Sequence, residues 1–242
     1  NRKIVDHLSD FNFVLTEHAR RYLILEGIKP ETIIKTGSHM KEVLDKYDEK
    51  IKKSKILNLL NLKKEKYFLI SMHREENVDN RENLNFLIES INTISKEFDL
   101  DIIISTHPRT KDRLNKNSFQ KFEKNVRFLK PFGFFDYIKL QKRAYCVVSD
   151  SGTITEESAL LNFPAITIRE SHERPEGMDE GILIMSGLKK ETIINSIKIT
   201  KKLFKNRKVN KIDDYESMTV SNKILKAVLS NIDYINRTTW YK

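Results

Sequence analysis

The sequence predicts an α/β fold in which helices cover a doubly wound parallel sheet. The chain has 242 residues, 39% of them hydrophobic, which is enough apolar material to bury a core. Apolar runs of strand length recur along the chain, and amphipathic helical patterns separate most of them. This alternation of strand and helix is typical of α/β proteins with a parallel sheet.

The apolar runs predict strands, and the periodic segments between them predict helices. The runs that read as strands are residues 11–15, 32–35, 67–71, 101–106, 126–129, 145–149, 165–168 and 182–185. The clearest helix is predicted over residues 81–98, where apolar side chains recur at spacings of three and four. A long charged helix is expected over residues 40–62 as a connection between domains.

The distribution of these elements predicts two unequal parts. Residues 1–60 are expected to be the tail of an amino-terminal Rossmann-like domain plus a connecting helix, because two strands cannot form an independent doubly wound sheet. Residues 61–242 are expected to form a carboxyl-terminal Rossmann-like domain whose final helix crosses back. The first part therefore reads as an incomplete domain whose beginning is absent.

Composition and charge exclude several classes of protein. The longest apolar runs are far shorter than the ~20 residues that span a bilayer, so neither a membrane segment nor a secretion signal is expected. The net charge of +10 favours anionic partners. No basic stripe is interleaved with aromatic residues, and the excess lysines read as a solvated surface rather than a nucleic-acid site. Cys146 lies in an apolar run and is expected to be a core residue. Because the sequence has one cysteine, no disulfide can form within the chain, which fits a cytoplasmic protein.

Polar clusters follow four of the predicted strands directly. They are "MHREEN" after residue 71, "HPRTK" after residue 106, "DSGTITEE" after residue 149 and "RESHERPEG" after residue 168. In open parallel sheets, ligands bind beyond the carboxyl ends of the strands. The clusters are therefore expected to converge on one ligand-binding rim.

The strongest local signal is the sequence Asp150-Ser151-Gly152-Thr153 at a strand-to-helix turn. Unpaired amides at a helix start bind phosphate, and Gly152 would allow a phosphate to approach the backbone closely. The alternative is that Thr153 and Glu156 form only a capping box. A capping box does not account for Glu157, whose carboxylate is suited to the hydroxyls of a ribose.

Three further features fit a nucleoside diphosphate. Arg174 could bind a diphosphate through its guanidinium fork, although ion pairs with Glu173 or Glu176 are an equal alternative. His73 could donate to a phosphate or act as a general acid. The segment "KPFGFFDYIKL" offers aromatic rings that could stack on a base, although most are expected in the core.

The sequence contains no nucleotide-hydrolysing Gly-rich loop and no His/Cys/carboxylate spacing for zinc, so no metal is expected.

These motifs together resemble the non-hydrolysing UDP-N-acetylglucosamine 2-epimerase family. The resemblance runs through nearly the whole chain, in "NRKIVDHLSD", "TEHARRYLILEGI", "TGSHMKEVL", "SMHREEN", "SDSGTITEES" and "RESHERPEG". The ending "NIDYINRTTWYK" resembles the branch that makes UDP-N-acetyl-L-fucosamine. The resemblance implies a GT-B-like architecture of two Rossmann-like domains, with the acidic catalytic residues largely in the amino-terminal one, before Asn1.

The resemblance also implies roles for individual residues. It places the rings of Tyr137 and Phe132 at uracil, and the turn of Ser151 and Gly152 at the diphosphate. Thr153 stands where a glycine is common in the family. Its backbone amide can still contact the ligand, but its side chain leaves less space for a ligand to approach the backbone closely. Glu157 aligns with the ribose ligand. Arg174 and His73 align with groups near the phosphates and the reacting sugar, and His73 is the catalytic candidate.

The implied reaction inverts C2 of a UDP-N-acetylhexosamine by elimination and re-addition of UDP, without a cofactor, in the synthesis of surface polysaccharide precursors. We expect this chain to be the UDP-binding part of such an isomerase, with little or no turnover when it is alone. A homodimer of the full-length protein is expected. The alternatives are a GT-B glycosyltransferase and a non-catalytic UDP-sugar-binding remnant. A nucleic-acid binder is the weakest alternative.

Overall fold

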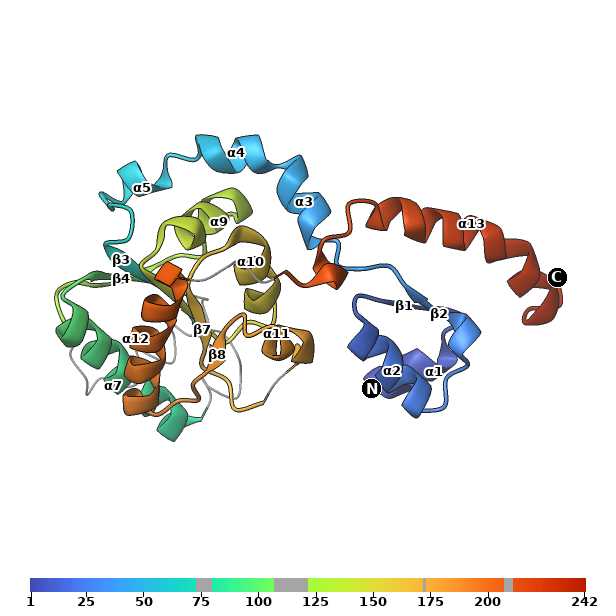
Figure 1. Ribbon diagram of the computed structural model, residues 1–242, viewed down its shortest axis with the longest axis horizontal. Coiled ribbons are helices and arrows are strands. Elements are labelled where there is room, and N and C mark those ends of the chain that lie inside the picture. The colour runs from blue at the N-terminus through green and yellow to red at the C-terminus, as the bar shows by residue number, and fades with distance from the viewer. Residues whose placement is uncertain (73–79, 107–121, 172, 207–210) are drawn as a thin grey trace. The chain divides into compact units, whose positions relative to one another are not determined.

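The computed structural model describes residues 1–72, 80–106, 122–171, 173–206 and 211–242 and divides the chain into two compact units (Figure 1). The first unit combines residues Asn1–Lys46 with Lys211–Lys242, and the second unit is the continuous segment Tyr47–Asn210. No helix in these ranges is both long enough and apolar enough to cross a bilayer.

The first unit is built from both ends of the chain. Its elements are α1 (Arg2–Leu8), β1 (Asn12–Val14), α2 (Glu17–Leu25), the 3₁₀ helix η1 (Pro30–Thr32), β2 (Ile33–Lys35), α3 (Met40–Lys46), the 3₁₀ helix η2 (Asp213–Tyr215) and α13 (Val220–Thr238). Strands β1 and β2 form a two-stranded parallel sheet. Asp214 joins the two segments, because its carboxylate accepts the backbone amide of Glu17 at 2.8 Å and pairs with Lys35 Nζ at 2.8 Å.

The second unit is an α/β domain around a six-stranded sheet in which every neighbouring pair is parallel. Its elements are α4 (Asp48–Lys53), α5 (Ile56–Leu59), β3 (Tyr67–Ser71), α7 (Arg81–Phe98), β4 (Asp101–Ser105), β5 (Val126–Leu129), α9 (Phe134–Arg143), β6 (Cys146–Ser149), α10 (Ile154–Leu161), β7 (Ala165–Thr167), α11 (Pro175–Asp179), β8 (Ile184–Met185) and α12 (Lys190–Asn206). The strand order is β5-β4-β3-β6-β7-β8. Numbered from β3, this is the order 3-2-1-4-5-6 of the doubly wound Rossmann fold.

Helices cover both faces of this sheet, as the strand side chains require. Phe68 and Ile70 of β3 point to one face, where they pack with α7 and α12. Tyr67 and Leu69 point to the opposite face, where they pack with α5, α9 and α10 (Figure 1). Side chains alternate along a strand, so a strand that is apolar at every position must be covered on both sides.

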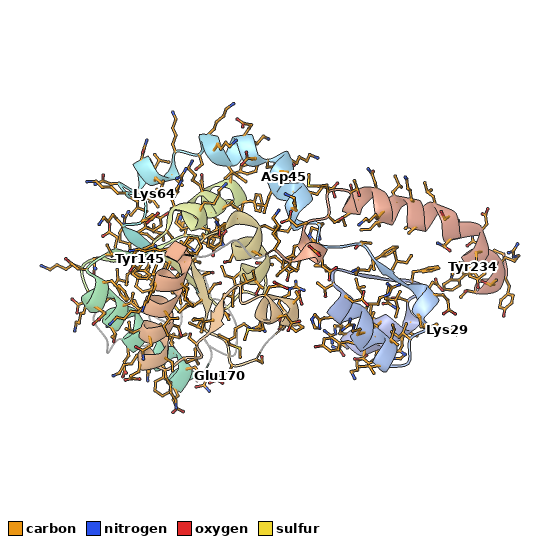
Figure 2. The ribbon with its side chains drawn as sticks, viewed as in Figure 1. Lys29, Asp45, Lys64, Tyr145, Glu170 and Tyr234 are labelled. Carbon is orange, nitrogen blue, oxygen red and sulfur yellow. The ribbon has the colours of Figure 1, made fainter. Side chains whose placement is uncertain are left out.

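The predicted strands, the doubly wound sheet and the core position of Cys146 are confirmed. Burial raises the pKa of the Cys146 thiol to about 12, which keeps it protonated. Charged side chains lie on the surface of the second unit, Lys64 and Glu170 among them (Figure 2).

One expectation about the connecting region is wrong. Residues 40–62 form three short helices rather than one, with breaks at Tyr47 and at Ser54. The chain leaves helical geometry at Ser54, whose hydroxyl donates to Asp136 Oδ1 of α9 at 2.5 Å. The compact units are divided after Lys46 and after Asn210, and a domain boundary at residue 60 stays a prediction. Helix α5 packs on the second unit, because Ile56 and Leu57 are part of the core beneath α9.

Candidate functional site

The candidate site lies where the strand order of the six-stranded sheet reverses. Strands β3 and β6 are neighbours, and the chain continues from them to opposite sides of the sheet. Their carboxyl ends meet, since the amide of Asp150 donates to the carbonyl oxygen of Ser71 at 3.2 Å. In doubly wound sheets, the crevice beyond such a switch point binds the ligand.

The turn from β6 into α10 presents hydroxyl groups and amides at this point. The amide of Ser151 donates to Ser149 Oγ at 3.1 Å, and the amide of Thr153 lies 3.3 Å from Ser151 Oγ. The hydroxyls of Ser151 and Thr153 are 3.0 Å apart. Because the first turn of a helix has amides without intrahelical partners and a positive end of the helix dipole, this turn is suited to an anion.

The structure contradicts the alternative that Thr153 and Glu156 form a capping box. Thr153 is the N-cap residue of α10, but its side chain makes no capping hydrogen bond. Glu156 is only 3% exposed and forms an ion pair with the NH2 of Arg174 at 2.7 Å. Glu156 therefore holds the loop that follows β7 against α10.

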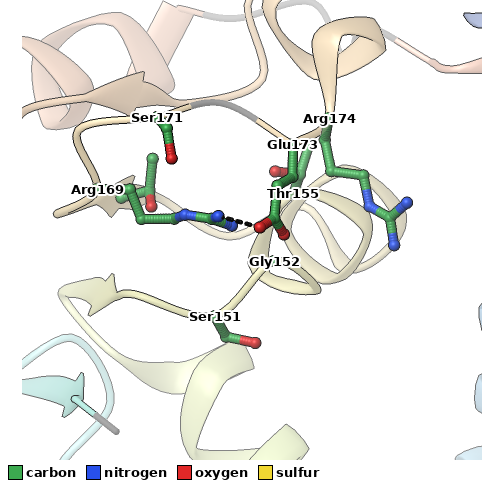
Figure 3. Close-up of a pocket in the computed structure, with 8 residues that line it drawn as sticks. Ser151, Gly152, Thr155, Arg169, Ser171, Glu173 and Arg174 are labelled. Carbon is green, nitrogen blue, oxygen red and sulfur yellow. Dashed lines mark ion pairs between the residues drawn. The ribbon is translucent and has the colours of Figure 1, made fainter. Parts of the chain in front are cut away.

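Arg174 was expected at the diphosphate or in an ion pair with Glu173 or Glu176. The structure shows an ion pair of Arg174 with Glu156, a residue for which capping had been the alternative expectation. Figure 3 shows the Arg174 side chain directed away from Arg169, although both residues line one pocket. The structure therefore gives Arg174 a role in positioning the loop, and a direct contact with phosphate stays a prediction.

The pocket joins the start of α10 to the loop after β7. Its lining residues are Ser151, Gly152, Thr155, Thr167, Arg169, Ser171, Glu173 and Arg174. Arg169 brings a cation close to the helix start, because a Cβ added to Gly152 would lie 3.6 Å from Arg169 NH1. The Arg169 side chain is only 6% exposed and forms an ion pair with Glu173 (Figure 3). Its Nε has no hydrogen-bond partner among the described residues.

Glu157 lies deeper in the first turn of α10 and is buried. Thr153 Oγ1 donates to Glu157 Oε1 at 2.9 Å, and Gln141 Nε2 donates to Oε2 at 2.5 Å. Burial raises the pKa of the Glu157 carboxyl, while these two hydrogen bonds act in the opposite direction. The predicted ribose ligand is thus fixed in orientation by residues of α9 and α10.

The two predicted aromatic residues, Phe132 and Tyr137, are partly buried and pack against the core beneath α9. The hydroxyl of Tyr137 is close enough to Ser71 and Gln141 for hydrogen bonding, and burial raises the pKa of this hydroxyl. Tyr137 is therefore anchored next to the switch point. A role in stacking on a base stays a prediction for both rings.

Two of the four predicted polar clusters cannot be compared with the structure. His73 and the rest of its cluster lie outside the described residues, as do His107 and Arg109. Within the described ranges, no group of three or more His, Cys, Asp or Glu side chains is placed to hold a metal ion.

Arg169 is the main functional candidate that the sequence analysis missed. It is the first charged residue after the apolar strand 165–168, and the rule that ligands bind at the carboxyl ends of strands could have identified it. Arg174, five residues later in the same motif, was predicted instead. Burial separates the two arginines, since Arg174 is 29% exposed whereas Arg169 is almost fully enclosed.

The fold defines a Rossmann-like, GT-B-type protein with a pocket beside the switch point of its sheet. A family model described as UDP-N-acetylglucosamine 2-epimerase matches residues 1–229. The chain belongs to the UDP-N-acetylglucosamine 2-epimerase family.

Individual relatives agree with this assignment. The chain is 37% identical over 203 residues to a UDP-N-acetylglucosamine 2-epimerase of Methanococcus maripaludis, covering 81% of this chain and 56% of that protein. The structure of UDP-N-acetylglucosamine 2-epimerase from Rickettsia bellii superimposes with a TM-score of 0.92 at 52% identity, covering 100% of this chain and 65% of the other.

A third relative is the UDP-GlcNAc 2-epimerase of Methanocaldococcus jannaschii, solved in complex with UDP-GlcNAc and UDP. It has a TM-score of 0.85 and 33% identity, covering 95% of this chain and 64% of the other. The chain thus spans somewhat more than half the length of the relatives that it matches.

Proposed function

We propose that the second unit of this chain binds UDP and the UDP moiety of a UDP-N-acetylhexosamine. The observation that carries the proposal is the enclosed guanidinium of Arg169, which faces the start of α10 at the switch point of the sheet. A cation and a helix start on opposite sides of one pocket are suited to a diphosphate. The family membership and the UDP complexes of the relatives support the choice of nucleotide.

The remaining contacts of the nucleotide are part of the same proposal. Ser151, Gly152 and the amide of Thr153 would contact the diphosphate together with Arg169. Glu157 would accept hydrogen bonds from the ribose, since each carboxylate oxygen can accept more than the one bond already present. Phe132 and Tyr137 would pack on uracil.

For the full-length protein we propose inversion of C2 of the sugar through elimination and re-addition of UDP. In this reaction the chain's own residues bind the leaving diphosphate and stabilise its charge as the bond to C1 breaks. His73 is proposed near the reacting sugar.

Resemblance to the family further supports a homodimer, a cytoplasmic location and a role in polysaccharide precursor synthesis. The proposed substrate is UDP-N-acetylglucosamine or a precursor of UDP-N-acetyl-L-fucosamine.

Titration calorimetry with UDP, UMP and uridine tests the binding proposal. We expect UDP to bind more tightly than UMP and uridine, because the diphosphate contributes the main contacts. The variant Arg169→Lys should bind UDP about 10- to 100-fold more weakly, since charge-assisted hydrogen bonds contribute ~1.5–3 kcal/mol. Arg237→Ala, which alters an exposed arginine at the end of α13, is the matched control. No heat with millimolar UDP would refute the proposal.

Proton NMR of the full-length protein in D₂O tests the reaction. An epimerase of this mechanism exchanges the C2 proton of the sugar with solvent as it inverts that carbon. A glycosyltransferase would transfer the sugar to an acceptor without deuterium entering C2.

A further inference from the structure

The pocket at the start of α10 already contains a negatively charged group, the carboxylate of Glu173. Glu173 forms an ion pair with Arg169, which lies four residues earlier in the chain (Figure 3). A Cβ added to Gly152 would lie 3.2 Å from Glu173 Oε2. The carboxylate therefore lies next to both the guanidinium of Arg169 and the backbone that precedes α10.

This position is one that an oxygen of a phosphate would occupy. Carboxylates and phosphates are both oxyanions, and the planar fork of a guanidinium binds either of them. The start of a helix favours either kind of anion for the same electrostatic reason. A diphosphate bound between Gly152 and Arg169 would therefore overlap the carboxylate of Glu173.

The burial of the two partners is unequal, and this determines which of them can move. Arg169 is 6% exposed, and a buried guanidinium without a neighbouring anion is strongly unfavourable. The Glu173 side chain is 52% exposed, so its carboxylate can return to water at small cost. If a phosphate replaces the carboxylate of Glu173 as the partner of Arg169, the guanidinium remains paired with an anion.

The backbone that follows Glu173 is held against α10. Arg174 is bound to the buried carboxylate of Glu156. Gly177 of α11 is in close contact with Thr155 of α10, since a Cβ at Gly177 would lie 2.1 Å from Thr155 Cγ2. The loop is thereby fixed to α10 immediately after Glu173.

We propose that Glu173 is an internal competitor of the nucleotide: its carboxylate occupies the diphosphate position when the site is empty and is displaced when UDP binds. This inference rests on the proposed function, because it concerns the same pocket. It adds a residue that sets the affinity for the nucleotide without contacting it. Removal of the competing charge should therefore increase the affinity, whereas removal of a binding residue would decrease it.

Calorimetry with Glu173→Gln tests this proposal, with UDP and inorganic pyrophosphate as the two probes. We expect both to bind about 3- to 10-fold more tightly to the variant, because the fraction of molecules with an open site increases. The matched control is Glu170→Gln, which changes an exposed glutamate of the same loop that is not among the pocket-lining residues and should leave both affinities unchanged (Figure 2). Unchanged or weaker binding to Glu173→Gln would overturn the proposal.

A double-variant cycle separates competition from an indirect structural effect. In an Arg169→Met background, Glu173→Gln should change UDP affinity by less than twofold, because the competition depends on Arg169. An equally large gain without Arg169 would show that Glu173 acts elsewhere, which overturns the proposal.

The two probes also separate this inference from the assignment of the nucleotide. If pyrophosphate binds more tightly to Glu173→Gln while UDP binds no better than pyrophosphate, the competitor is confirmed and the uridine assignment is wrong. If UDP binds to the wild-type protein but Glu173→Gln brings no gain, the proposed function stands and the competitor is refuted. If neither probe binds to either protein, both proposals fail.

Discussion

Gly177 illustrates how a single methyl group can decide the geometry of the loop. It lies in α11, where a Cβ would come within 2.1 Å of Thr155 Cγ2. Gly177→Ala must therefore displace α11 or Thr155, and it moves the loop that carries Arg174. We expect the free energy of unfolding to fall by about 1–3 kcal/mol, as in other overpacked sites, together with weaker UDP binding. Urea denaturation and calorimetry measure the two effects.

Thr155→Ser provides the control for this prediction, because it removes Cγ2 and keeps the hydroxyl. The double variant Gly177→Ala/Thr155→Ser should recover most of the lost stability and affinity. A double variant as impaired as Gly177→Ala alone would show that the clash with Cγ2 is not the cause.

Glu157 gives the protein a pH-dependent component of stability. Burial raises the pKa of its carboxyl above the ordinary value of 4.5. A carboxyl with a higher pKa in the folded than in the unfolded state stabilises the fold below the ordinary pKa, and this stabilisation is lost as the pH rises through the raised pKa. Glu157→Gln cannot ionise. We therefore expect the free energy of unfolding of the variant, relative to the wild type, to increase as the pH rises above 4.5.

Urea denaturation between pH 4 and pH 8 tests this expectation. The quantity compared is the difference in the free energy of unfolding between Glu157→Gln and the wild type at each pH. A difference that does not change with pH would show that the Glu157 carboxyl is not perturbed.

The sequence was informative about which segments form the site but not about which side chains face one another. The turn Asp150–Thr153 was correctly located between the end of a strand and the start of a helix, because strand ends follow from the hydrophobic pattern. The pairs Arg174–Glu156 and Arg169–Glu173 could not be predicted, since several arginines and glutamates lie within a few residues of one another. Only the packing of α11 on α10 distinguishes these pairings.

Helix α7 depends on its cap in a way that can be measured. The side chain of Asn80 accepts hydrogen bonds from the amides of Glu82 and Asn83 at 2.9 and 3.2 Å. Asn80→Ala removes both bonds, and we expect the free energy of unfolding to fall by about 1 kcal/mol. Asn80→Asp keeps an accepting oxygen and should remain close to the wild type. Urea denaturation compares the three proteins, and equal losses for Ala and Asp would contradict a capping role.

The elements themselves were predicted to different degrees. Residues 81–98 were predicted as a helix and form one with the same bounds, because the apolar spacing there is unbroken over the whole segment. The helix expected over residues 40–62 was wrong in its continuity. Its interruption depends on the contact of Ser54 with Asp136, which are distant in sequence, and no local pattern reveals such a contact.

The division into units predicts which part of the protein is autonomous. The second unit, residues 47–210, is continuous and contains the complete six-stranded sheet with helices on both faces. We expect this segment, expressed alone, to unfold in one cooperative transition and to gain thermal stability when UDP is added. Residues 1–46 expressed alone should show no such transition, because their partner segment is missing. A non-cooperative second unit would refute this prediction.

The overall organisation could be predicted only in part. Alternation of strands and helices predicted the parallel sheet, whose pattern repeats locally along the chain. The final helix was expected to cross back, but the contacts that join the two ends of the chain could not be predicted, because Asp214 reaches Glu17 and Lys35 across almost the whole sequence.

This joining of early and late residues has a consequence during translation. Residues 1–46 emerge from the ribosome long before residues 211–242, which belong to the same unit. At ~5–20 residues per second, synthesis of the intervening segment takes about 10–30 s. Over that interval Glu17 and Lys35 lack the contacts that Asp214 makes with them in the folded chain, so the early segment of a nascent chain is less stabilised than in the finished one.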